Sequence, residues 1–327
     1  KTSLEIYPIE IKKEELQKTV GEFHKTISDS ALNLNYKEPA RKLFNLLLKP
    51  AAEQLRGKTS LVIIPDSFLW EIPFQTLITT ENRFLIEQFT ILYAPSLTVL
   101  REMNKKPRLF SKKPTLLAFG NPRLDLNTAA DLETKRGTKF GDLPSAEKEV
   151  DFLLKLYGAE RSKIYKRSLA TETAFKDNFK GFNILHFATH GVLDNQNPMY
   201  SAIILTSAIN SNDDGILEAW ELAEMNLEAD LAVLSACETG RGTFIGEGII
   251  GLSWSFFVPG APRVVASQWK VESASTTQLM TEFHRNLNSM SNKAVAKSLQ
   301  TAMIKLLRNP RYRHPFYWSG FISIGKN

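Results

Sequence analysis

Two short stretches of sequence decide the fold: Ile184-Leu-His-Phe-Ala-Thr-His190-Gly191 and Leu231-Ala-Val-Leu-Ser-Ala-Cys237-Glu-Thr-Gly240. Each is an apolar run that gives way abruptly to small and polar residues, as a buried parallel strand does where it emerges at the carboxyl edge of a sheet. The first run delivers a histidine followed by glycine, and the second delivers the only cysteine of the chain. Because reactive groups in open α/β sheets collect beyond the carboxyl ends of the strands, we expect His190 and Cys237 to share one cleft.

The chain on either side of these runs alternates strand-like and helix-like segments. Further apolar runs predict strands at 61–65, 89–93, 115–120, 202–205, 263–268 and 316–324. Amphipathic spacing predicts helices at 96–103, 145–157, 171–179, 217–225, 249–258, 275–288 and 293–307, with Ser96, Ser145 and Thr171 as amino-terminal caps. This alternation predicts an α/β fold in which helices flank a mostly parallel sheet.

The amino-terminal part is expected to form a separate unit. Apolar residues recur at helical spacing over 11–55, and a basic, proline-punctuated segment follows at 104–114. We therefore predict an accessory unit over residues 1–110 and a catalytic domain over 111–327. Residues 121–142 carry no apolar period and are predicted to be a long surface loop.

Composition excludes several classes of protein. With 43% hydrophobic and 23% charged residues in 327, the chain is typical of a globular protein, and no apolar stretch approaches the roughly 20 residues that cross a bilayer. The net charge of +6 comes from scattered lysine pairs, so neither a nucleic-acid partner nor a membrane partner is expected. A single cysteine excludes an internal disulfide and fits a reducing, cytoplasmic location. The chain begins at Lys1, which we interpret as a fragment of a longer protein.

Cysteine and histidine at neighbouring strand ends suit nucleophilic catalysis. They are 47 positions apart, histidine first, close to the spacing of roughly 50 in caspases. A thiolate attacks peptide carbonyls, and a histidine in the same cleft can move the protons. The backbone N–H groups of Gly191 and Cys237 are the expected oxyanion-hole donors. The alternatives are a small inert cysteine and a structural histidine; His186, in the same run, is either a buried structural residue or a partner of His190.

At these residues the chain resembles the CHAT family of caspase-like cysteine proteases, related to caspases, gingipains and separase. The similar runs are 185–191, 214–222, 234–240, 246–252, 264–271 and 314–318, together with 64–74 and 94–96 upstream. The resemblance extends over about residues 43–327 and fills both the histidine and the cysteine positions of the family's motif.

The resemblance implies an active endopeptidase with His190 and Cys237 as its dyad and with no metal or cofactor. It implies that the amino-terminal unit is a degenerate, pseudo-caspase-like α/β accessory with added helices. It also makes Ser267-Gln268-Trp269 an edge strand that pairs with substrate backbone. Glu272 is then either part of the primary specificity pocket, favouring a basic side chain before the cut, or an exposed carboxylate at a helix start. Family members cut specific protein partners, several of them in bacterial defence, under the control of a sensor module or activating partner.

Two other functions remain open on the sequence. One is a catalytically silent scaffold that keeps the fold and binds a partner. The other is a phosphate-binding loop at 240–248, which lacks the Gly-x-x-x-x-Gly-Lys-Ser/Thr pattern. Within the predicted loop, Arg123, Lys135 and Arg136 are either self-cleavage points or solvated charges.

Overall fold

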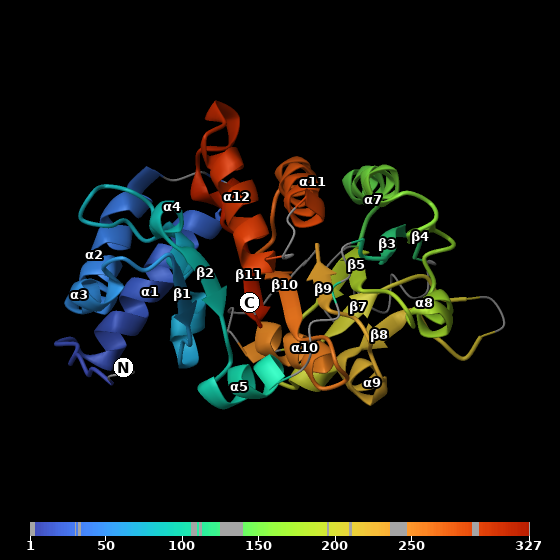
Figure 1. Cartoon of the computed structure of the whole chain (residues 1–327), viewed down its shortest axis with the longest axis horizontal. Helices are drawn as coiled ribbons and strands as arrows, with labels where there is room; N and C mark the ends of the chain where they lie inside the picture. Colours follow the sequence, from blue (N-terminus) through green and yellow to red (C-terminus); the bar gives the residue numbers. More distant parts are fainter. Residues whose placement is uncertain are drawn as a thin grey trace.

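The computed structural model describes residues 4–326 except 30, 32–33, 106–109, 111–112, 125–139, 195, 209–210, 236–246 and 290–293, with only the backbone of 247–251. Its centre is an eight-stranded sheet with strand order β1-β2-β11-β10-β9-β5-β3-β4 (Figure 1). All neighbouring strands are parallel except β10 and β11. The strands are β1 Ser60–Ile63, β2 Thr90–Tyr93, β3 Leu116–Pro122, β4 Ser162–Arg167, β5 Ile184–Ala188, β9 Leu231–Leu234, β10 Arg263–Ser267 and β11 Phe321–Gly325. The predicted mostly parallel α/β sheet is thereby confirmed.

Helices cover both faces of this sheet, as Figure 1 shows: α7, α11 and α12 lie over one face, and α5, α9 and α10 lie over the other. The helices are α1 Lys13–Ser28, α2 Lys37–Leu47, α3 Ala52–Leu55, α4 Leu85–Gln88, α5 Leu97–Lys105, α7 Pro144–Tyr157, α8 Glu172–Asn178, α9 Ala219–Glu224, α10 Glu247–Phe257, α11 Ser273–Ser289, α12 Val295–Leu307 and α13 Pro315–Trp318. Because both faces are covered, β3, β5, β9 and β10 are buried along their whole length. This burial explains why the strand sequences are apolar throughout rather than alternating. In the described residues no helix is both long and apolar enough to span a bilayer.

A second, three-stranded antiparallel sheet stands beside the main one. It consists of β6 His190–Val192, β7 Ala202–Ile204 and β8 Ile216–Glu218. The chain passes from β5 into β6 at Thr189, so the run that looks like a single strand in the sequence serves two sheets. Its second half thereby leaves the main sheet at the carboxyl edge.

Strands from both sides of residue 110 belong to the main sheet. The amino-terminal pair β1 and β2 joins it through β11, where Tyr93 lies opposite Ile324. The buried Tyr93 hydroxyl donates to Gln75 at 2.8 Å, and the Gln75 side chain donates to the Ser319 carbonyl at 2.7 Å. The first and last parts of the chain are thus tied together by buried hydrogen bonds.

Most predicted elements are present, and the differences have local causes. Ser96 and Thr171 accept hydrogen bonds from the backbone N–H groups of Val99 and Ala174, as expected of caps. The predicted cap at Ser145 is wrong, because the helix already begins at Pro144, a residue whose fixed φ suits the first helical position. The predicted helix 217–225 loses its first two residues to β8.

The partly buried His24 on α1 makes the stability of the fold sensitive to acid. Burial lowers the pKa of His24 to about 4, and its ring meets Trp269 edge-on with centroids 5.8 Å apart. Between pH 6.5 and 4 the unfolded chain therefore takes up a proton that the folded chain does not, so stability is complete above that window and falls within it. Lowering the pH from 7 to 5 is expected to cost about 2 kcal/mol more in the wild type than in His24→Gln. Urea unfolding at both pH values measures this difference; the same loss in both proteins would show that His24 does not contribute.

Candidate active site

The two strands that deliver the predicted dyad are direct neighbours. β5 and β9 are parallel, with His186 opposite Val233 and Phe187 opposite Leu234. The backbone N–H of Ser235 donates to the Phe187 carbonyl at 2.8 Å, so the pairing continues to the carboxyl end of both strands. Both strands therefore end at the same edge of the sheet, as their sequences predict.

His190 is held rigidly just beyond this edge. It is 2% exposed, its Nε2 lies 2.7 Å from the Gly141 carbonyl oxygen, and its ring meets Phe140 edge-on at 5.1 Å. A carbonyl oxygen only accepts, so Nε2 carries a proton and donates it to Gly141. In the neutral imidazole, this tautomer places the basic lone pair on Nδ1.

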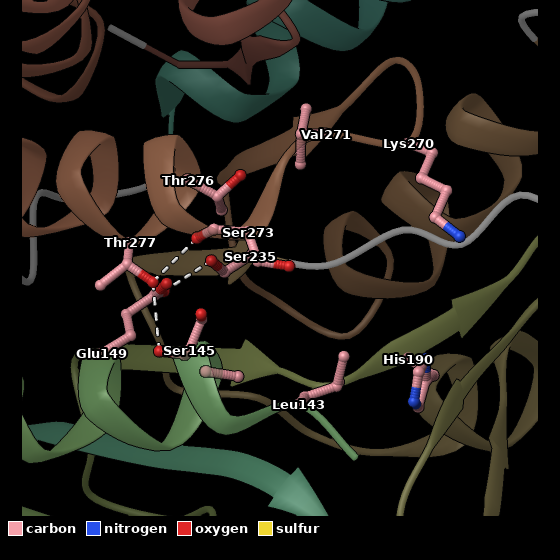
Figure 2. Close-up of a pocket in the computed structure, with 11 residues that line it drawn as sticks. Leu143, Ser145, Glu149, His190, Ser235, Lys270, Val271, Ser273, Thr276 and Thr277 are labelled. Carbon is pink, nitrogen blue, oxygen red and sulfur yellow. Dashed lines mark hydrogen bonds between the residues drawn. The ribbon is translucent and has the colours of Figure 1, made fainter. Parts of the chain in front are cut away.

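His190 lines a pocket at the carboxyl edge of the sheet. The pocket volume is about 80 Å³, enough for several waters, since one water needs about 10–15 Å³. Its walls come from the start of α7, the end of β9, the segment before α11 and the start of α11 (Figure 2). Five of the eleven lining residues carry a hydroxyl group: Ser145, Ser235, Ser273, Thr276 and Thr277. A pocket that contains several hydroxyl groups therefore lies directly beside the predicted general base.

A buried carboxylate also lines the pocket. Glu149 on α7 is 2% exposed, and its Oε1 accepts from Ser235 Oγ at 2.5 Å and lies 2.8 Å from His186 Nε2. His186 Nδ1 lies 3.2 Å from His284 Nε2, and His284 Nδ1 lies 3.0 Å from the Tyr157 hydroxyl. One continuous hydrogen-bonded chain thus connects helices α7 and α11 to the end of β9.

The protons along this chain can be assigned from the number of partners. In the described part of the chain, the Tyr157 hydroxyl meets one hydrogen-bonding atom, His284 Nδ1, and burial raises the pKa of Tyr157, so the hydroxyl stays protonated and donates. Burial, and then the neighbouring His186, lower the pKa of His284 well below its ordinary value, so His284 is neutral. Its one remaining proton is on Nε2 and points at His186 Nδ1. His186 is then neutral as well and donates from Nε2 to Glu149. Every hydrogen bond of the chain points toward the carboxylate.

These contacts bear on the open question about His186. It is fully buried on β5, whereas His190 belongs to β6, so alternation along one strand does not relate the two side chains. His186 contacts Glu149 and His284, and Glu149 lines the same pocket as His190. It is a buried residue of the hydrogen-bonded chain.

Cys237 lies outside the described residues, as do Lys135 and Arg136. The last described residue before the cysteine is Ser235, two positions earlier, and it lines the pocket together with His190. Gly191 is described and lies in β6 opposite Ile203 of β7.

The residues predicted to bind substrate are mostly buried. β10 is an interior strand: Ser267 pairs with Phe321 of β11, and the Gln268 N–H donates to the Gly320 carbonyl at 2.6 Å. The prediction of an edge strand at Ser267-Gln268-Trp269 is therefore wrong on the β11 side, because the last strand of the chain occupies that edge. The three side chains are at most 3% exposed.

Glu272 lies at a helix start, as in the second of its two predicted roles, but it is partly buried rather than exposed. Its carboxylate accepts from the Ser275 N–H at 2.6 Å, which caps the start of α11 and places the charge at the positive end of that helix. It lines a neighbouring pocket, beside Lys270 and Tyr317, rather than the one that contains His190.

Sequence reasoning missed two residues of this site. Glu149 carries a detectable signal, because it lies on the same helix face as the buried Leu153, and a charge on an apolar face is normally paired. Gly141 carries none, because it acts through its backbone carbonyl, which every residue possesses.

Comparisons with known proteins identify the family of the chain. The sequence model of the CHAT domain family matches residues 37–326. Tetratricopeptide repeat protein 28 of Mus musculus is 25% identical over 341 aligned positions, which cover 89% of this chain, and the human protein of that name is 24% identical. The chain spans about 13% of the length of these curated relatives.

Two solved structures align with the chain at low sequence identity. The separase–securin complex of Saccharomyces cerevisiae aligns with TM-score 0.50 and 14% identity, covering 78% of this chain and 14% of that one. The cysteine proteinase gingipain R aligns with TM-score 0.48 and 10% identity, covering 96% of this chain and 74% of that one. With a family match over nearly its whole length and an eight-stranded α/β sheet of caspase-like type, the chain belongs to the CHAT domain family.

Proposed function

We propose that this chain is a cysteine endopeptidase in which Cys237 is the nucleophile and His190 is the general acid and base. The observation that supports this proposal most is the shared edge of β5 and β9, where His190 and Ser235 line one pocket. Two residues of extended chain span at most about 7 Å, so the cysteine cannot be far from the end of β9.

The reaction assigns each proton to a named atom. His190 Nδ1 takes the proton of the Cys237 thiol, and the thiolate sulfur attacks the substrate carbonyl carbon. The backbone N–H groups of Gly191 and Cys237 stabilise the oxyanion, a contribution of about 3–4 kcal/mol for each such donor in other enzymes. The imidazolium then gives its proton to the leaving amine as the C–N bond breaks and an acyl-enzyme forms. Finally Nδ1 takes a proton from water, and the hydroxide that forms attacks the acyl carbon. The C–S bond breaks, which releases the carboxylic acid, and Nδ1 returns its proton to the sulfur and restores the thiol.

The Gly141 carbonyl supports this cycle by holding Nε2–H at 2.7 Å. It keeps the ring in one orientation and stabilises the positive charge that appears on the imidazole during each turnover. Burial of His190 makes this stabilisation stronger than it would be in water.

For the biological role, we infer cleavage of a specific protein partner after an activating signal, in bacterial defence or another form of regulated proteolysis. The support is family membership, together with the tetratricopeptide repeats that the name of the relatives gives.

Thiol labelling tests the proposal directly, because the chain has a single cysteine. A peptide that carries a carbonyl electrophile should add once per chain, at a rate well above that of the same peptide with the urea-unfolded protein. His190→Ala should reduce the rate to the unfolded level. Equal rates for folded wild type and His190→Ala would remove His190 from the mechanism and favour a silent scaffold.

A further inference from the structure

We propose that the pocket beside His190 receives the side chain of the substrate residue before the cut, that it selects arginine or lysine, and that Glu149 determines this choice. This inference rests on the proposed endopeptidase function and adds the class of substrate. It starts from a buried carboxylate that the proposed mechanism does not use.

The position of the pocket suits the residue whose carbonyl is attacked. His190 and Ser235 line it together, so it lies between the proposed base and the end of the strand that leads to the nucleophile. In Figure 2, Glu149, Ser145, Ser235 and Thr277 gather at one side, and His190 lies at the other. A side chain entering beside His190 would therefore extend toward the carboxylate.

One oxygen of the Glu149 carboxylate remains available to a ligand. Both hydrogen bonds of Glu149, from Ser235 and His186, end on Oε1, and within the described residues none ends on Oε2. Two hydrogen-bond donors on one oxygen favour the carboxylate form of this side chain. A guanidinium or ammonium group entering the pocket would find a buried anion with a free oxygen, together with hydroxyl oxygens as further acceptors.

The neighbouring histidine does not cancel this charge. A protonated His186 would have to donate from Nδ1 to His284, and His284 would in turn have to donate to Tyr157. The Tyr157 proton would then have no acceptor within the described residues, at a buried position. The neutral chain leaves one net negative charge, and it is on Glu149.

Two features of the pocket oppose this charge, and both are weaker. The starts of α7 and α11 open on the pocket, but a helix end amounts to about half a charge and acts over about one turn. Each end already has a carboxylate, Glu147 in the first turn of α7 and Glu272 at Ser275 N of α11. Lys270 also lines the pocket, but Figure 2 shows its amino group extending away from Glu149. An aspartate before the cut would face Glu149 and be repelled.

The test compares peptides that differ at one position. Three otherwise identical peptides carry arginine, citrulline or aspartate before the cut; citrulline has the shape of arginine without its charge. The wild-type chain is expected to cleave the arginine peptide with a kcat/KM about 30-fold or more above that of citrulline, and to leave the aspartate peptide uncut. Glu149→Gln keeps an oxygen for Ser235 and His186, and its arginine-to-citrulline ratio is expected to fall to about 1.

Two variants separate a specific role of Glu149 in selecting arginine from a general effect of removing a carboxylate. Glu172→Gln removes another buried carboxylate, on α8, where it pairs with Lys176 away from the pocket, and is expected to keep the wild-type ratio. Glu272→Gln tests the competing carboxylate: a ratio of 1 in this variant, with Glu149→Gln unchanged, would overturn the assignment. Equal cleavage of the arginine and citrulline peptides by the wild type would also overturn it.

A binding experiment keeps the inference testable without turnover. Cys237→Ala is titrated with acetylated dipeptide amides ending in arginine or citrulline, followed by calorimetry. Tighter binding of the arginine peptide by about 10-fold, lost in Cys237→Ala/Glu149→Gln, supports the pocket. Equal binding overturns it. A wild type that cleaves no peptide and has an unreactive thiol would end the endopeptidase proposal. The binding result would still decide whether the pocket prefers arginine.

Discussion

Replacing Cys237 with alanine is expected to lower the rate of peptide cleavage by about 10⁴-fold or more. The reason is chemical: without the thiolate there is no acyl-enzyme, and the remaining donors and binding groups accelerate only direct attack by water. Cys237→Ser should lose nearly as much, because a hydroxyl near neutral pH is far less ionised than a thiol. Cleavage of a fluorogenic arginine peptide by the activated protein measures both rates.

His190→Ala is expected to lose activity to a similar extent, and the double variant should be little worse than either single one. Residues that act as one unit in catalysis are strongly non-additive, since removing one already disables the other. Losses that multiply in the double variant would mean that the two residues act in separate steps. Comparable turnover by Cys237→Ser would exclude the cysteine as the nucleophile.

Replacing Phe187 with alanine is expected to destabilise the protein by about 3–5 kcal/mol, the largest effect on folding that we predict. Phe187 is 1% exposed on β5, at the centre of an aromatic cluster. Its ring centroid lies 5.7 Å from that of Phe119, 5.3 Å from that of Phe175 and 6.1 Å from that of Phe256. Alanine leaves a cavity whose walls are the rings contributed by β3, α8 and α10.

Urea unfolding, followed by tryptophan fluorescence, measures the loss as a shift of the midpoint. Phe187→Leu retains most of the volume and should lose roughly 1.5 kcal/mol or less. Leu169→Ala is the control, since that leucine is 69% exposed and its removal should change the free energy of unfolding by less than about 0.5 kcal/mol. A loss in Phe187→Ala no larger than that of the control would show that the cluster contributes no packing energy.

The fold was predictable from the sequence where burial alone determines which residues occur in an element. β3, β5, β9 and β10 are buried on both faces, so their sequences are apolar without interruption and stand out from the helices. β8 was missed because its three residues, Ile216–Glu218, run directly into α9 and share its apolar pattern. The break at Thr189 was missed because β5 and β6 are both buried, so hydrophobicity does not change where the chain leaves one sheet for the other.

The site was predictable in part for a similar reason. His190 and Ser235 come to one pocket because parallel strands that are neighbours must end at the same edge, and the sequence runs themselves show the strand ends. The place of Ser267-Gln268-Trp269 depended instead on β11, the last strand, which inserts between β2 and β10. No local pattern encodes the partner of a strand that is more than 50 residues away.

The sequence by itself determined the fold class and the family, and it predicts a histidine–cysteine pair after two strand ends, because local patterns of residue type reflect burial and chain direction. Only the tertiary structure decided which atom of His190 holds a proton, that Glu149 reaches the pocket and that Glu272 caps a helix instead. These outcomes depend on distances of 2.5–2.8 Å between groups on separate elements. Hydrogen bonds and buried charges act only at such distances, and the packing of α7, α11 and the sheet sets those distances.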